Sequence, residues 1–157
     1  MNKHRAIEII CVVFLVIFIF MVSGNDSYSS KTVKEVSDAV TAKIDMEALS
    51  SVKKNKVKAE FGIDFSGVDS FAYYASESIM TVDEVLIIKL KEGVKADDVT
   101  EKIETRIKNK QVLFEGYAPQ QSALLKDYVL KVKDGFVFYA VGEKAKEALS
   151  TFTKTIR

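Results

Sequence analysis

An uncharged apolar run near the N-terminus constrains this chain more than any other feature. Residues 9–22 (IICVVFLVIFIFMV) carry no charge, follow the basic segment KHR and precede the polar stretch NDSYSSK. A basic, then apolar, then polar order is typical of an exported protein whose basic end stays in the cytoplasm. We therefore expect residues 1–24 to form a signal anchor or signal peptide, residues 25–31 a polar linker, and residues 32–157 one extracytoplasmic domain.

The sequence allows the leader either to be retained as a membrane anchor or to be cleaved as a signal peptide. A helix from Ala6 to Gly24 would be about 28 Å long, enough for an upright span of a hydrocarbon core about 30 Å thick. Val22-Ser23-Gly24 also offers small residues at the positions that a signal peptidase reads. We expect a single-pass membrane protein with its C-terminal domain outside the cytoplasm, and secretion after cleavage following Gly24 is the alternative. Cys11 lies at the start of the run rather than after its end, which argues against a lipid-modified cysteine.

The composition of the remaining chain excludes several classes of function. Residues 25–157 carry 21 basic and 21 acidic side chains. A neutral domain cannot hold a polyphosphate strongly, because that needs clustered basic side chains, so nucleic acid is not an expected partner. The single cysteine, Cys11, and the single histidine, His4, both lie in the leader. Without imidazole or thiol in the domain, we expect no catalytic, metal-binding or cofactor-binding site.

Hydrophobic periodicity predicts an α+β domain. Helices are expected over residues 33–46, 47–61, 96–114, 119–126 and 145–156, and strands over 68–77, 84–91, 128–133 and 136–141. Thr32 to Glu35 has the form of a capping box, Gly62 suits the left-handed end of a helix, and Asp134-Gly135 is a hairpin signal. The strand that begins at Glu84 is apolar on both faces, which predicts an interior strand. The order predicts a four-stranded, mainly antiparallel sheet with helices packed on it.

Two features are candidates for recognition. The first is an aromatic cluster on a predicted strand: Phe71, Tyr73 and Tyr74. It either binds a ligand or packs that strand into the core. The second is a segment that places an aromatic ring, a proline turn and two amides together: Tyr117, Pro119, Gln120 and Gln121. It is either a recognition loop or a corner between two helices.

Adjacent carboxylates occur at Asp83-Glu84 and at Asp97-Asp98. Either pair could supply acid and base chemistry, although turn and helix-start preferences also explain both. We therefore expect a membrane-tethered, non-catalytic binding or interaction module with an unidentified protein or cell-envelope partner. The alternative is a secreted carboxylate-dependent hydrolase of cell-envelope polymer, which requires that the acids converge in a pocket.

Residues 114–142 (FEGYAPQQSALLKDYVLKVKDGFVFYAVG), with the strand DEVLIIKLKE before them, resemble a bacterial family known only as domain of unknown function 4358. The resemblance covers about residues 32–157. It implies a small exported or membrane-attached protein of Gram-positive bacteria, often a lipoprotein, and it implies no activity or catalytic residue. This chain departs from the pattern because no cysteine follows its apolar run and because Gln120 stands where an acidic residue is expected.

Overall fold

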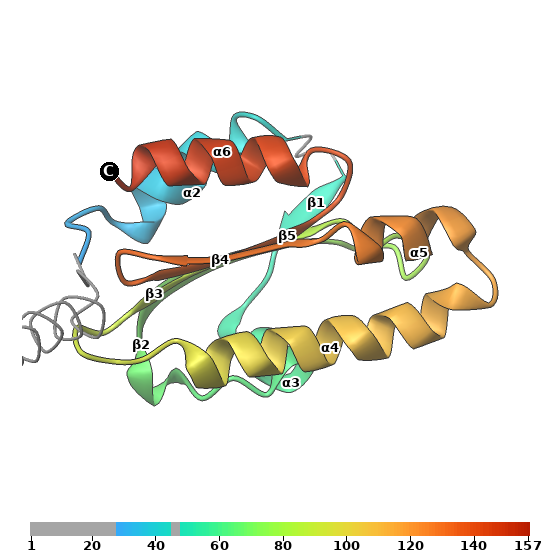
Figure 1. The fold of residues 1–157 in the computed structure, drawn as a ribbon, viewed down its shortest axis with the longest axis horizontal. Helices are drawn as coiled ribbons and strands as arrows, with labels where there is room; N and C mark the ends of the chain where they lie inside the picture. Colours follow the sequence, from blue (N-terminus) through green and yellow to red (C-terminus); the bar gives the residue numbers. More distant parts are fainter. Residues whose placement is uncertain (1–27, 45–47) are drawn as a thin grey trace, which may run out of the picture.

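Five strands form one antiparallel sheet, and helices cover both of its faces (Figure 1). The computed structural model describes residues 28–44 and 48–157, so the expected leader over residues 1–24 lies outside the described residues. The strand order is β1-β2-β3-β5-β4, with bounds β1 Leu49–Ser51, β2 Val68–Ser76, β3 Glu84–Leu90, β4 Val129–Lys133 and β5 Phe136–Val141. One face is covered by α2 (Val33–Thr41) and α6 (Ala145–Thr155). The other is covered by α3 (Lys54–Phe61), α4 (Asp97–Glu115) and α5 (Pro119–Lys126), with a 3-10 turn at Phe65–Gly67. Within the described residues, no helix combines the length and the apolar character that crossing a bilayer requires.

The structure confirms the α+β class and corrects the number of strands. The periodicity predicts a helix over residues 47–61, but β1 (Leu49–Ser51) is a strand, and the helix begins only at Lys54. The two serines of β1 have poor helix propensity, and the edge of β2 offers unpaired backbone groups across from them. β1 pairs antiparallel with residues 74–76 of β2. This fifth strand depends on a partner distant in sequence, which local periodicity does not report.

β3 lies between β2 and β5 and supplies both hydrophobic cores. All seven of its residues are buried, as its apolar sequence predicts. Leu86 and Ile88 face the layer of α3 and α4, whereas Val85 and Ile87 face the layer of α2 and α6. The strand also buries its two charged side chains, and buried charges need partners to be tolerated.

Residues 28–31, part of the expected polar linker, are held against the sheet, and we call them the N-terminal strap. The Tyr28 hydroxyl donates to the carbonyl of Leu90 at 2.7 Å. The buried ammonium of Lys89 donates to the carbonyl of Lys31 at 2.6 Å and lies 4.9 Å from the centre of the Tyr28 ring. The strap therefore begins at the end of the sheet where β3 finishes (Figure 1).

The N-terminal strap contacts the turn between β4 and β5. Asp134 and Gly135 both have positive φ, 51° and 82°, which is the geometry that an Asp-Gly hairpin turn favours. The Ser29 amide donates to the carbonyl of Asp134 at 2.9 Å. The Tyr28 ring packs so closely on Gly135 that a Cβ there would lie 2.6 Å from a ring carbon.

Replacing Gly135 with alanine should destabilise the domain by about 1–3 kcal/mol, since alanine at positive φ is strained and its Cβ collides with Tyr28. Adding Tyr28→Ala to Gly135→Ala should recover the part of the lost stability that the collision causes. Gly116→Ala is the matched control, because Gly116 has a φ of −86° and open space at its Cβ position. Denaturant unfolding measures the free energy of unfolding of all three variants. If Tyr28→Ala recovers none of the stability lost in Gly135→Ala, the contact between strap and turn is contradicted.

Candidate functional site

A carboxylate is buried at the first position of the central strand. The Glu84 side chain is only 2% exposed. Its Oε1 accepts hydrogen bonds from Arg106 at 2.6 Å, the Tyr139 hydroxyl at 2.6 Å and the Lys110 ammonium at 3.2 Å. Its Oε2 accepts a hydrogen bond from the Tyr73 hydroxyl at 2.6 Å. Three of the four donors share Oε1, and one donates to Oε2, so both oxygens are hydrogen-bonded.

The strand register explains why two tyrosines reach the same carboxylate. Tyr73 on β2 and Tyr139 on β5 are both paired with Leu86, one from each side. Glu84 lies two residues before Leu86 on the same face, so both rings are its diagonal neighbours across the sheet. Helix α4 passes over this face and supplies Arg106 and Lys110 together, because side chains four residues apart share one side of a helix.

A second acid completes the arrangement. Arg106 Nη2 donates to Glu60 Oε2 at 2.9 Å, and the guanidinium lies 4.1 Å from the centre of the Phe61 ring. The Tyr73 hydroxyl also lies 3.3 Å from Glu60 Oε2. We call the six polar side chains the Glu84 cluster: Glu60, Tyr73, Glu84, Arg106, Lys110 and Tyr139. Two acids and two bases make its formal charge zero.

The electrostatics of the Glu84 cluster keep Glu84 ionised. Burial acts to raise the pKa of Glu84, but the charges of Arg106 and Lys110 and the hydrogen bonds from its neighbours outweigh burial and hold the pKa below its usual range. Burial and the charge of Glu84 raise the pKa of the Tyr73 and Tyr139 hydroxyls. An ionised, buried carboxylate that is held by four donors suits a structural role better than proton transfer.

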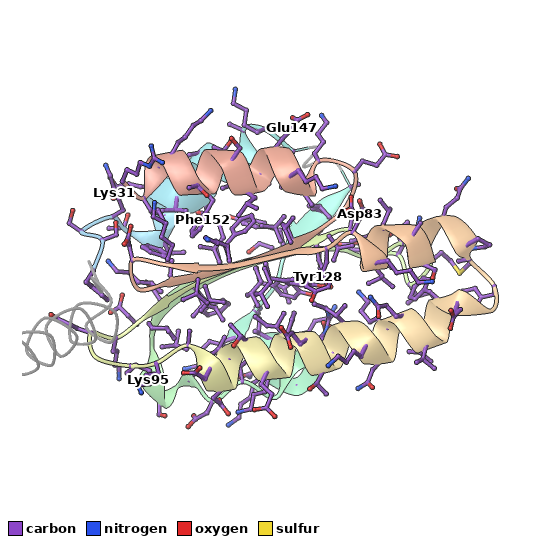
Figure 2. All side chains as sticks on the ribbon, in the orientation of Figure 1. Lys31, Asp83, Lys95, Tyr128, Glu147 and Phe152 are labelled. Carbon is purple, nitrogen blue, oxygen red and sulfur yellow. The ribbon has the colours of Figure 1, made fainter. Side chains whose placement is uncertain are left out.

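A cleft of about 310 Å³ opens at the end of the sheet where β3 begins and β5 ends, with lining residues from both helical layers. We call it the Asp83 cleft. Its apolar lining is Ile44, Ala48, Leu49, Leu124, Val85, Val141 and Ala145, and its remaining lining is Asp83, Gln121, Gly142, Glu143 and Lys144. These residues come from the start of β3, the end of β5, the beginning of α6, α5 and the β1 region. Figure 2 shows Asp83 beneath the beginning of α6, at the other end of the sheet from Lys31.

Asp83 is the half-buried acid of this cleft. A Cβ on Gly142 would lie 2.6 Å from Asp83 Oδ1, so the carboxylate packs directly on the Gly142 backbone, whose φ is 136°. Burial raises the pKa of Asp83, and the negative charge of Glu143 raises it further. Among residues 28–44 and 48–157, no lysine or arginine forms an ion pair with the Asp83 carboxylate.

The structure separates the residues of the proline-turn segment. Gln121 lines the Asp83 cleft and accepts a hydrogen bond from the Val82 amide at 2.9 Å through its side-chain oxygen. Tyr117 is 56% exposed and its ring lies 5.3 Å from that of Phe114. Pro119 is the first residue of α5, and Gln120 is exposed beside it. Only Gln121 of this segment therefore reaches the cleft.

The three candidate aromatic residues of β2 do not share one surface. Phe71 and Tyr73 lie on the face covered by α3 and α4, and the neighbouring Tyr74 lies on the other face because side chains alternate along a strand. Phe71 packs edge-on against Phe65 with a centroid distance of 5.2 Å. Tyr73 belongs to the Glu84 cluster and is 1% exposed.

Neither adjacent pair of acids converges. Asp83, just before β3, lines the cleft, whereas Glu84, the first residue of β3, lies in the cluster. Asp97 and Asp98 are exposed in the first turn of α4, where Asp98 pairs with Lys102 at 2.7 Å. In the described part of the chain, no group of three or more acidic, histidine or cysteine side chains is arranged to hold a metal ion.

Sequence reasoning missed the Glu84 cluster, although one signal was present. A glutamate opens a strand that is predicted to be buried on both faces, and such an acid needs buried donors. Arg106 and Lys110, four residues apart on the helix predicted over residues 96–114, are the basic pair that meets this need. The Asp83 cleft had no comparable signal, because its lining residues come from five separate segments.

Replacing Glu84 with glutamine should destabilise the domain by about 3–5 kcal/mol at neutral pH, because Lys110 and Arg106, both largely shielded from water, lose the buried carboxylate that they share. Only Arg106 keeps another acid, Glu60. The folded-state pKa of Glu84 is depressed, so the wild-type advantage should be complete above about pH 4.5 and shrink as the pH falls through the folded pKa. Denaturant unfolding of both proteins over a pH series measures the difference in their free energies of unfolding. Glu104→Gln, at an exposed position of α4, is the control and should follow the wild type. A wild-type advantage that grows in acid would refute this assignment.

The comparisons with known proteins identify a family and no function. A family model described as a domain of unknown function (DUF4358) matches residues 42–142, which is more than half of the chain. The match spans all six residues of the Glu84 cluster and ends at Gly142 in the Asp83 cleft. No curated protein and no solved structure matches the chain. The chain belongs to the DUF4358 family of domains of unknown function.

Proposed function

We propose that this chain is a membrane-tethered extracytoplasmic binding module that uses no catalysis and recognises its partner at the Asp83 cleft. The location rests on the sequence of the leader, in which a basic segment precedes an apolar run and a polar stretch. The binding role rests on the cleft, the mixed concave site that combines an apolar floor with a half-buried acid.

The observation that carries the proposal is that strap and cleft lie at opposite ends of the sheet. β3 begins at Glu84 beside the cleft and ends at Leu90 beside the strap. Seven residues of strand span about 23 Å. Only residues 25–27 separate the expected leader from the strap, so the strap end of the domain would lie close to the bilayer. The cleft would then face away from the membrane, where a partner can reach it.

The chemistry of the two acidic sites favours binding over catalysis. Glu84 is buried and held by four donors, three on Oε1 and one on Oε2, so a substrate in solution does not reach it. The Asp83 cleft contains no serine, threonine or cysteine nucleophile among its described lining residues. An acid in an apolar cleft without a nucleophile beside it is suited to holding a ligand.

A carboxylate-dependent hydrolase of cell-envelope polymer is the second candidate function. It has one favourable observation: Asp83 and Glu143 line the same cleft, and burial raises the pKa of Asp83 toward that of a general acid. Incubating the full chain with purified envelope polymer and measuring released soluble fragments tests it. Release that Asp83→Asn abolishes would favour the hydrolase, and no release by the wild-type protein would dismiss it.

The location is tested by fractionation combined with protease treatment of intact cells. We expect the full-length mass in the membrane pellet, because an uncleaved leader keeps the chain in the bilayer. Externally added protease should degrade the domain in intact cells, since the domain lies outside the cytoplasm. A soluble secreted product that starts at Asn25 would show that the leader is cleaved and does not anchor the chain. Digestion only after cell lysis would show that the domain lies inside the cytoplasm.

The binding role is tested by filling the cleft. Ala48 is exposed at the cleft, and Ala48→Trp should obstruct it; Ala123→Trp adds the same side chain to an exposed position of α5 outside the cleft. Co-sedimentation of the detergent-solubilised full chain with isolated cell envelopes measures binding. We expect Ala48→Trp to weaken binding by about tenfold or more, as loss of a central contact does, and Ala123→Trp to leave it unchanged. Equal binding by both variants would rule out the cleft as the binding site.

A further inference from the structure

We propose that the Asp83 cleft binds a primary ammonium group carried on an apolar chain, with the Asp83 carboxylate accepting its hydrogen bonds and the apolar floor contacting the chain. This inference rests on the proposed binding role of the cleft and names the class of ligand that the cleft takes.

The first argument is the uncompensated charge of Asp83. The side chain is half-buried against Gly142, and no ion pair with a described lysine or arginine offsets its partial loss of water. Glu84, the next residue, is buried with four donors around it. Asp83, just before the strand, has a backbone hydrogen bond but no ion pair with a described side chain. A ligand that donates charged hydrogen bonds would supply a counter-charge.

The surrounding charges favour a cation over an anion. Glu143 lies close enough to Asp83 for its negative charge to act on that carboxylate. Lys110 also acts on Asp83 and lowers its pKa, but it is already paired with Glu84 at 3.2 Å. Glu143 and Lys144 both line the cleft and are both exposed, so water screens their opposite charges alike. The half-buried Asp83 carboxylate therefore sets the preferred sign of charge, which favours a cation over an anion.

The lining also sets the type of cation and the size of its chain. Val85, Leu124 and Val141 form an apolar floor, and no aromatic side chain is among the described lining residues. Quaternary ammonium groups are held by aromatic cages, whereas a primary ammonium can donate three hydrogen bonds to carboxylate and carbonyl oxygens. A volume of about 310 Å³ is at the small end of ligand sites and fits a short aliphatic chain rather than a polymer strand.

Backbone amide NMR titrations of the isotope-labelled full chain in detergent test the ligand class. The four probes share a five-carbon chain and differ in the head group: pentylammonium, pentyltrimethylammonium, 1-pentanol and pentanoate. We expect pentylammonium to bind about tenfold more tightly than the other three, with shift changes centred on Val85, Gly142 and Ala145. Equal affinity for 1-pentanol, tighter binding of pentanoate or of the quaternary amine, or shift changes elsewhere would overturn the proposal.

Two variants connect the binding to Asp83. Asp83→Asn keeps the size of the side chain and removes its charge, and it should weaken pentylammonium binding by about tenfold or more. Glu147→Gln is the matched control, because Glu147 is exposed on the side of α6 that faces away from the sheet (Figure 2). Unchanged affinity in Asp83→Asn would overturn the proposal. If Asp83→Asn fails to fold, the proposal is tested by comparing the affinities of the wild-type protein for pentylammonium and 1-pentanol.

The outcomes separate this inference from the proposed function. If Ala48→Trp abolishes binding to cell envelopes while pentylammonium shows no preference over 1-pentanol, the cleft is a binding site for another chemistry and the inference fails alone. If pentylammonium binds at Asp83 and Ala48→Trp leaves envelope binding unchanged, the ligand class stands while the cell-envelope partner is rejected.

Discussion

The fold depends on one buried carboxylate. Glu84 joins β3 to β2 through Tyr73, to β5 through Tyr139, and to α4 through Arg106 and Lys110. Arg106 extends the connection to Glu60 and therefore to α3. Hydrophobic packing stabilises these elements, and the short charged hydrogen bonds of Glu84 add a requirement for one strand register and one rotation of α4. The Glu84 cluster thus specifies how the α3 and α4 layer sits on the sheet.

Two adjacent acids at the start of β3 have different surroundings. Glu84 lies in the cluster, and Asp83, the residue just before the strand, lines the cleft at the end of the sheet. The same donors that hold Glu84 in place fix the start of β3, and with it the position of the Asp83 carboxylate against Gly142. The strap is held at the far end of the sheet by Tyr28 and Lys89, so the strap and the cleft lie at opposite ends of β3.

Local signals in the sequence predict most of the elements and little of the site. The Asp134-Gly135 turn, the capping box at Thr32 and the helix that starts at Pro119 are correct because a few adjacent residues determine each of them. The strand β1 was missed because its stability comes from pairing with β2 across the sheet. The Glu84 cluster and the Asp83 cleft were missed for the same reason, since their members meet only after the layers pack.

A double-mutant cycle between Glu84 and Arg106 tests the central claim most directly. The cycle uses Glu84→Gln, Arg106→Met and the double variant, and it measures the free energy of unfolding of each beside the wild type. Because the two charges are buried 2.6 Å apart, the account predicts a coupling free energy of about 2 kcal/mol or more. A coupling smaller than about 0.5 kcal/mol would mean that the two side chains act independently, and the fold would then not depend on their contact.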